Sequence, residues 1–200
     1  LPKMFLRVLI VSALIFTLTF TLFVRMAANK VREEATKHAN SELSNTIHQI
    51  DAVLNAVEIA VENTAWMVPY RLSSPNFMYN ITETILQNND FICGSAVAFE
   101  PDYYASEGHF FSPYSYRDQD GQIKSMQLGS DNYDYHYMDW YQIPKLLNES
   151  YWSEPYYDQG GGNMMMTTYS KPLYDQYGNL YAVITADLSL DWLTELVSGI

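Results

Sequence analysis

An uncharged run of 17 residues, Val8 to Val24, constrains the fold of this chain most strongly. A run of this length is close to what a helix needs to cross a membrane, and its hydroxyl groups can bond back to the helix's own carbonyls. A cleaved signal peptide is the alternative, but no convincing small-residue cleavage site follows, Ala27-Ala28 being the nearest. We therefore predict an uncleaved anchor, with residues 1–25 as the cytoplasmic end and the transmembrane helix.

Charge divides the chain into two parts. Six of the eleven Lys and Arg residues lie in the first 40 positions, whereas five basic residues stand against 21 acidic ones from residue 41 onward. The net charge of −12 argues against a nucleic-acid partner, because phosphates need the opposite sign. The single Cys93 excludes a disulfide scaffold.

The orientation in the membrane does not follow from charge, since basic residues flank both ends of the apolar run. The acidic, tyrosine-rich body with one Cys favours the outside. We expect residues 26–200 to be extracytoplasmic (periplasmic), held at the inner membrane by the helix before them.

Residues 26–68 are predicted to form a long helix. Its apolar residues recur at alternating intervals of four and three, the 3.5-residue period of a coiled-coil seam: Leu43, Ile47, Ile50, Leu54, Val57 and Val61. Two interpretations stay open. In the first, the stripe packs on the domain's own sheet. In the second, residues 26–66 pair two copies in a parallel homodimer. One helix could do both, at different positions along its length.

After a second helix at 76–88 the periodicity becomes that of strands. Five strands are predicted, with hairpin turns at 118–121 and 174–179: 93–99, 109–117, 123–128, 164–173 and 180–188. Strands joined by tight turns form an antiparallel sheet. We expect an α+β fold in which the long helix packs on one face of the sheet, an excursion over 129–162 covers the other, and Ser189 caps a closing helix.

Aromatic and acidic residues gather between positions 133 and 158. Aromatic faces and carboxylates both attract cations, so the cluster indicates a ligand pocket beside the flexible glycine loop at 160–162. Each single Tyr is also explained as a core residue whose hydroxyl reaches water. We find no catalytic set, no metal-ligand spacing and no phosphate loop, and predict no catalytic residue, no metal and no cofactor.

Four stretches of the chain resemble the distal module of double Cache domains, the extracellular sensors of bacterial transmembrane receptors. They are Tyr151–Asp158, Thr168–Pro172, Tyr177–Asn179 and Ile184–Leu190, and the likeness covers residues 25–200. It implies a PAS-like (Cache) antiparallel sheet on a long helix that continues from the membrane. The Cache module would occupy residues 69–190, and residues 191–200 would be a linker helix to a downstream module.

The resemblance also implies a set of ligand-binding residues. Members that bind amino acids carry Tyr, four residues, Arg, one residue and Trp-Tyr, followed by Tyr-x-Asp and a final Asp. The corresponding positions here are Tyr133, Met138, Asp139, Trp140, Tyr141, Tyr156, Asp158 and Asp187. Met138 stands where the Arg is expected, so a bound carboxylate would face Asp158 and Asp187 without a partner. The family includes an amine-sensing variant that lacks this Arg, and we expect a small amine or amino-acid-like ligand.

The leading hypothesis is therefore a ligand sensor, itself not an enzyme, that passes a conformational change to the membrane helix. A histidine kinase or serine phosphatase output domain would lie downstream. A ligand-free dimerisation module is one alternative, which a pocket filled by Tyr side chains would favour. An anchored extracellular hydrolase is another, although the sequence shows no nucleophile–base arrangement.

Overall fold

The computed structural model describes residues 2–159 and 162–198. Its first element is α1, a single helix from Pro2 to Ala65. It ends ahead of Pro69, which has no N–H to donate to the carbonyl of Ala65. The short helix α2 (Met67–Tyr70) follows. The predicted long helix is thus continuous with the apolar run.

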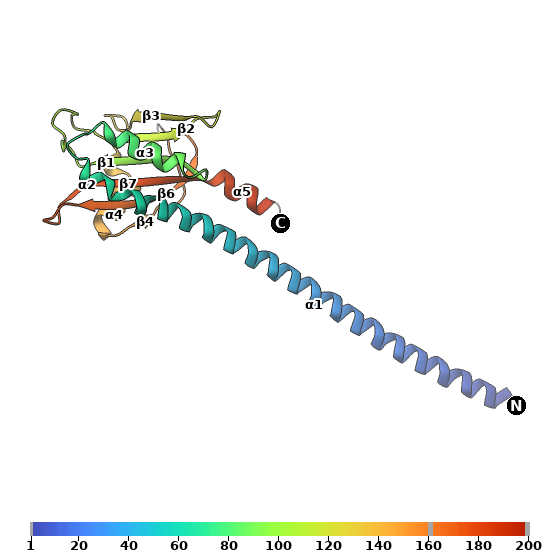
Figure 1. Ribbon diagram of the computed structural model, residues 1–200. Coiled ribbons are helices and arrows are strands. Elements are labelled where there is room, and N and C mark those ends of the chain that lie inside the picture. The colour runs from blue at the N-terminus through green and yellow to red at the C-terminus, as the bar shows by residue number, and fades with distance from the viewer. Residues whose placement is uncertain (1, 160–161, 199–200) are drawn as a thin grey trace. The chain divides into compact units, whose positions relative to one another are not determined.

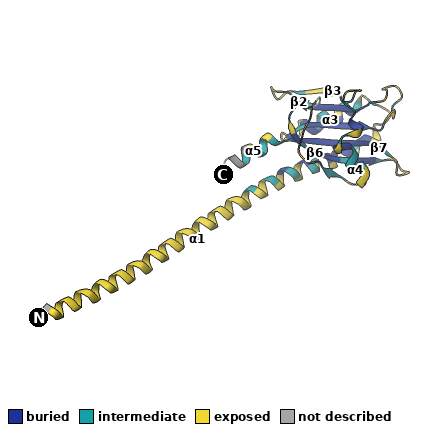
Figure 2. Cartoon of the chain, turned by 180° about the vertical axis from the view of Figure 1, so that it is seen from behind, coloured by how far each residue is buried: buried dark blue, intermediate teal, exposed yellow. Residues whose placement is uncertain are grey.

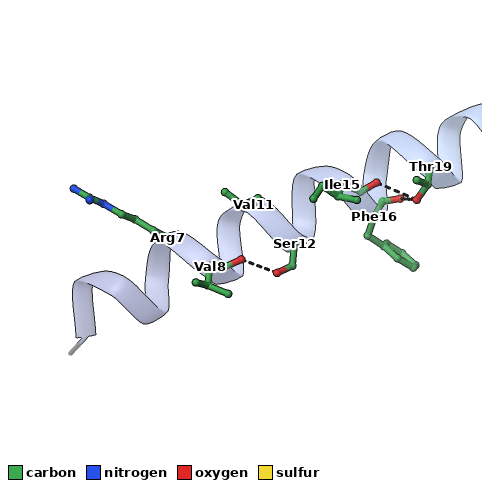
Figure 3. Close-up of a pocket in the computed structure, with 7 residues that line it drawn as sticks. All are labelled: Arg7, Val8, Val11, Ser12, Ile15, Phe16 and Thr19. Atoms are coloured by element: carbon green, nitrogen blue, oxygen red, sulfur yellow. Dashed lines mark hydrogen bonds between the residues drawn. The ribbon is translucent and has the colours of Figure 1, made fainter.

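The apolar run within α1 has the length and composition of a helix that crosses a membrane. Its hydroxyls bond back to the helix as predicted: Ser12 donates to the Val8 carbonyl at 2.6 Å, and Thr19 to the Ile15 and Phe16 carbonyls at 3.0 Å. Figure 3 shows these bonds on the groove that runs from Arg7 to Thr19 along the helix. The hydroxyls are satisfied without water, as a lipid environment requires.

The chain divides into two compact units, residues 1–48 and residues 49–200. The second unit holds an antiparallel sheet, whose seven described strands run in the order β3-β2-β1-β7-β6-β4, with β5 also paired to β6 (Figure 1). The strands are β1 (Ile92–Phe99), β2 (Pro113–Arg117), β3 (Ile123–Gln127), β4 (Tyr151–Trp152), β5 (Tyr156–Tyr157), β6 (Met165–Tyr174) and β7 (Leu180–Ser189). The remaining helices are α3 (Phe77–Gln87), the 3-10 turn η1 (Tyr135–Tyr137), α4 (Asp139–Leu147) and α5 (Leu190–Ser198).

The two faces of the sheet have different coverings. On the first face, Ala182, Ile184 and Ala186 of β7 join a core with the end of α1 and with α3. On the second face, Val183 packs with aromatic side chains from β2, η1 and α4. The alternation along β7 is the period of two that a strand buried on both sides shows, and Figure 2 shows the central strands buried. The predicted α+β architecture is confirmed.

The heptad stripe on α1 changes environment along its length. Val57 and Val61 are 1% and 0% exposed and belong to the core of the first face. Leu43 and Ile47 are 58% and 48% exposed. The C-terminal part of the stripe therefore packs on the domain's own sheet. Pairing of two chains through residues 26–66 stays a prediction.

Two details of the predicted strands are wrong. The strand predicted at 109–117 begins only at Pro113, because side chains take the backbone donors before it: the N–H of Phe111 donates to the Tyr135 hydroxyl and that of Ser112 to Gln127 Oε1. The excursion over 129–162 also contributes β4 and β5, so the described sheet has seven strands rather than five. Gly160 and Gly161 of the predicted glycine loop lie outside the described residues.

The turns and the final cap are as predicted. The Asp118 and Asp175 carboxylates each accept two backbone N–H groups within their hairpins, and Gly121 and Gly178 supply the positive φ that these turns need. The Ser189 hydroxyl accepts the N–H of Asp191 at the start of α5.

Candidate ligand site

A small cavity lies on the second face of the sheet. We call it the acidic cavity; its described lining is Ala96, Tyr114, Leu128, Tyr133, Trp140, Tyr156, Asp158, Thr185 and Asp187. Its volume is 10 Å³, room for about one water molecule. A larger ligand therefore needs the surrounding side chains to move.

Asp187 is placed by β7 and its neighbour β6. It is 4% exposed, and its Oδ1 accepts a hydrogen bond of 2.8 Å from the hydroxyl of Thr168, the residue opposite it in the β6–β7 register. Burial, reinforced by the nearby charge of Asp158, raises the pKa of Asp187 to about 7. This carboxyl group therefore exchanges its proton near neutral pH.

Asp158 follows β5 and is 5% exposed. Its Oδ1 accepts the Tyr133 hydroxyl at 2.8 Å, and its Oδ2 accepts the N–H of Gly162 at 2.6 Å. The backbone N–H of Asn163 donates to its carbonyl at 2.8 Å. The Tyr133 and Gly162 donors hold the carboxylate toward the cavity, and the Asn163 N–H fixes the backbone of the same residue.

Hydroxyl groups connect the aromatic wall to the carboxylates. The Tyr156 and Thr168 hydroxyls lie 2.8 Å apart, and because Thr168 donates to Asp187, Tyr156 is the donor in this pair. Burial and the neighbouring carboxylates raise the pKa values of Tyr133 and Tyr156 far above their usual value. Both phenols stay neutral hydrogen-bond donors at physiological pH.

Tyr114 and Gly94 complete the floor of the cavity. The Tyr114 side chain is buried, and its hydroxyl makes no hydrogen bond of good geometry to a described residue. Gly94 lies opposite Asp187 at an irregularity of the β1–β7 register. A Cβ at Gly94 would lie 2.4 Å from both Asp187 Oδ2 and the Tyr114 hydroxyl, so glycine makes room for these two groups.

The structure brings five of the eight predicted ligand residues together around the acidic cavity: Tyr133, Trp140, Tyr156, Asp158 and Asp187. The other three do not line it. Tyr141 follows Trp140 in α4, and consecutive helical residues point about 100° apart. Its hydroxyl donates to Glu100 at 2.6 Å, in a group that Lys145 joins. Met138 precedes α4 as its half-buried N-cap residue, and Asp139 is exposed in the first turn.

The sequence did not single out Tyr114, Thr168 or Thr185 as site residues. Thr185 is two positions from Asp187 on β7, and a period of two puts both on one face. That alternation was available from the sequence. Tyr114 and Thr168 depend on which strands neighbour β7, which single-strand patterns do not show.

The described lining of the acidic cavity suits a positively charged group. Two carboxylates and four aromatic rings line it, and no Lys, Arg or His is among its described lining residues. Aromatic faces and carboxylates both attract positive charge. Among the described residues, no group of three His, Cys, Asp or Glu side chains is arranged to hold a metal ion.

Comparisons with known proteins agree with this architecture. Residues 78–195 match the family described as "Methyl-accepting chemotaxis protein-like, first PDC sensor domain". This range exceeds half of the chain and contains every described lining residue of the acidic cavity. No curated protein sequence matches the chain significantly.

Solved structures show the same fold. The chain is similar to the extracellular domain of soHK1S-Z6, assigned as a histidine kinase, with 29% identity and a TM-score of 0.67 over 85% of this chain and 66% of that one. Methyl-accepting chemotaxis protein X shares 20% identity, with a TM-score of 0.69 over 83% of this chain and 66% of that one. The ligand-binding domain of Mlp24, solved with asparagine, shares 16% sequence identity. Its TM-score is 0.58, over 80% of this chain and 61% of that one. The chain thus spans about two thirds or less of each solved chain.

Proposed function

Because the chain belongs to the family of methyl-accepting chemotaxis protein-like, first PDC sensor domains, we propose that it senses a small cationic amine in the acidic cavity. The observation that carries this proposal is the pair of buried carboxylates, Asp158 and Asp187, without a cation among the described lining residues. An ammonium group would bind between them and face the Trp140 ring. The predicted likeness to Cache sensors is confirmed at the level of this family.

An amine fits the cavity better than an amino acid. The α-carboxylate of an amino acid would lie near two Asp side chains, and its charge would lack a cationic partner. Met138, at the position where the resemblance expects Arg, is outside the described lining and offers no charge. Mlp24 was solved with asparagine, but at 16% identity the likeness concerns the fold alone.

A ligand-free module is the second candidate, and the cavity volume favours it. At 10 Å³ the space between Tyr114, Tyr133 and Tyr156 is nearly filled by protein. Against this candidate stand the two carboxylates, since a purely structural core gains nothing from two buried acids without a counter-ion. The family is one of sensor domains, so the hydrolase alternative is not carried further.

The place of the domain in a receptor is part of the same proposal. We propose that it is the distal of two extracytoplasmic modules, that α1 anchors it in the inner membrane, and that α5 leads to the next module. The description of the family as a first PDC domain and the partial coverage of the solved chains support this. The exposed Leu43 and Ile47 support a homodimer through residues 26–66.

A contact between the sheet and α1 supports a route for the signal. Tyr169 and Lys171 of β6 both bond to Glu62 on α1, the Tyr169 hydroxyl at 3.3 Å. Thr168, next to Tyr169 on the strand, bonds to Asp187 in the cavity. A ligand that moves β6 would therefore change the contact of Tyr169 and Lys171 with Glu62 on α1. The helix α1 contains the apolar run that we propose as the membrane anchor.

A thermal-shift screen of the full chain in detergent micelles tests the ligand class. Alkylamines, amino acids and organic acids are added separately while tryptophan fluorescence follows unfolding, because a ligand of the folded state raises the melting temperature. We expect amines alone to raise it. Asp187→Asn should abolish the shift, whereas Asp120→Asn, which changes an exposed carboxylate outside the cavity, should keep it. A rise in melting temperature with amino acids alone would exclude a simple amine as the ligand. If no compound raises the melting temperature, the ligand-free module is favoured.

A further inference from the structure

The two carboxylates of the acidic cavity have no compensating charge. Asp158 and Asp187 are 5% and 4% exposed, and neither takes part in an ion pair between described residues. Two buried anions in one small space repel each other and lose their hydration. Something positive has to accompany them when both are ionised.

The groups that surround Asp187 supply hydrogen bonds but no positive charge. Every element packed around it presents a neutral side chain: Cys93 of β1, Tyr114 of β2, Tyr133 before η1, Tyr156 of β5 and Thr168 of β6. The pKa values of Cys93 and of the three Tyr residues are raised, by burial first and then by the carboxylates. These groups therefore do not offset the paired charge, nor do they add to it at neutral pH.

The hydrogen bonds single out one oxygen of the pair. Both oxygens of Asp158 accept donors, from Tyr133 and Gly162, and Oδ1 of Asp187 accepts the Thr168 hydroxyl. The remaining oxygen, Oδ2 of Asp187, lies near the Tyr114 hydroxyl beside Gly94, and hydrogen bonding from Tyr114 opposes part of the rise in the pKa of Asp187. A proton on Oδ2 is therefore accommodated when the Tyr114 hydroxyl turns from donor to acceptor, while the donors to the other three oxygens keep their places.

We propose that the Asp158–Asp187 pair holds one proton on Oδ2 of Asp187, and that a cationic ligand binds by displacing it. This inference rests on the proposed function. The ammonium enters with its own protons, the carboxyl proton leaves to solvent, and the pair becomes the dianion that holds the cation. Proton and ligand thus compete for one site, and the domain responds to acidity as well as to its ligand.

The pKa of Asp187, raised by burial and by Asp158 to about 7, puts this competition in the physiological range. An alkylamine stays protonated below about pH 9, so only the site titrates there. Below about pH 7, each ligand bound releases one proton, and its apparent affinity falls about tenfold per pH unit. Above that pH, the affinity is nearly constant.

Two measurements on the full chain in micelles test the exchange. The first follows the carbonyl stretching band of protonated carboxyl groups by difference infrared spectroscopy between about pH 5.5 and 8.5, without ligand. We expect one band to disappear around pH 7 in the wild type and to be missing from Asp187→Asn, whereas Asp120→Asn, at an exposed hairpin carboxylate, retains it. The wild-type reading does not depend on either variant folding.

The second measurement titrates ethylammonium into the chain by calorimetry, in buffers of different ionisation enthalpy. About one proton should be released per ligand at pH 5.5 and almost none at pH 8.5. Binding with no proton release and no pH dependence would overturn the exchange and leave the proposed function intact. A wild type without a titrating band would also overturn it. A titrating band without ethylammonium binding at any pH would instead exclude that amine and support the proton on the pair.

Discussion

The two faces of the sheet bury different kinds of side chain, although the same strand, β7, contributes to both. On the first face, β7 contributes Ala182, Ile184 and Ala186 to an apolar core under α1 and α3. On the second face, the alternate residues Thr185 and Asp187 are turned toward a cavity. The first face gains stability from buried apolar area, whereas the second buries acids that burial disfavours. This difference supports the proposal of a ligand site on the second face. Substitutions on the two faces should therefore separate stability from binding.

The largest effect is expected on the first face. Ile184→Ala removes a side chain that is 0% exposed and should lower the free energy of unfolding by about 2–5 kcal/mol. Ile184→Val, the milder control, should cost about 0.5–1.5 kcal/mol. Urea unfolding followed by fluorescence measures both. A loss below about 1 kcal/mol for the alanine variant would contradict a tightly packed first face.

Next comes the pH dependence of stability, which belongs to the second face. The pKa of Asp187 is about 7 in the folded chain against an ordinary value of 3.8, so between these values the folded chain binds the extra proton. Its stability should therefore fall as pH rises from about 4 to about 7, by at most about 4 kcal/mol from this group. Unfolding curves at several pH values, compared with Asp187→Asn, isolate the contribution. Identical pH profiles for the wild type and Asp187→Asn would show that Asp187 does not cause the pH dependence of stability.

A methyl group at Gly94 should disturb the cavity more than the fold. The new Cβ of Gly94→Ala meets the ends of two side chains, Asp187 and Tyr114, which must shift. Overpacking of this kind costs about 1–3 kcal/mol, and the displaced carboxylate should weaken amine binding at least tenfold. Calorimetry and urea unfolding measure the two effects. Unchanged affinity would mean that the floor of the cavity does not contact the ligand.

The smallest effect is expected where β6 meets α1. Glu62 receives hydrogen bonds from Tyr169 and Lys171, but the Glu62 and Lys171 side chains are 43% and 28% exposed. Exposed ion pairs contribute about 0–1 kcal/mol, so Glu62→Gln should leave stability within about 1 kcal/mol and amine affinity unchanged. Its consequence should appear in signalling by the intact receptor. A large loss of stability would make this contact part of the core rather than a relay.

The fold was largely predictable because its signals are local. Residues 3–65 contain no Gly or Pro, which lets α1 run unbroken, and Asp with Gly marks both hairpins. The short strands β4 and β5 were missed because two residues carry no period, and they exist only as partners of β6. The stretch before Pro113 looked like a strand, but Tyr135 and Gln127, distant in the sequence, take its backbone donors.

The site was predictable in its composition but not in its geometry. The resemblance grouped Asp158 with Asp187, and both line one cavity although they are 29 positions apart in the sequence. It also grouped Trp140 with Tyr141, which the helical rotation of α4 separates. The role of Gly94 depends on the β1–β7 register, which no pattern within one strand contains.

One measurement compares the two faces directly. The four Trp side chains give separate indole N–H signals in a ¹⁵N-labelled chain; Trp140 lines the acidic cavity, whereas Trp152 donates to Glu58 at 2.8 Å on the side of α1. Addition of ethylammonium at about pH 8, where Asp187 is largely ionised, should shift the Trp140 signal and leave that of Trp152 in place. A shift of Trp152 without Trp140, or no shift at saturating amine, would contradict a cation site on the second face.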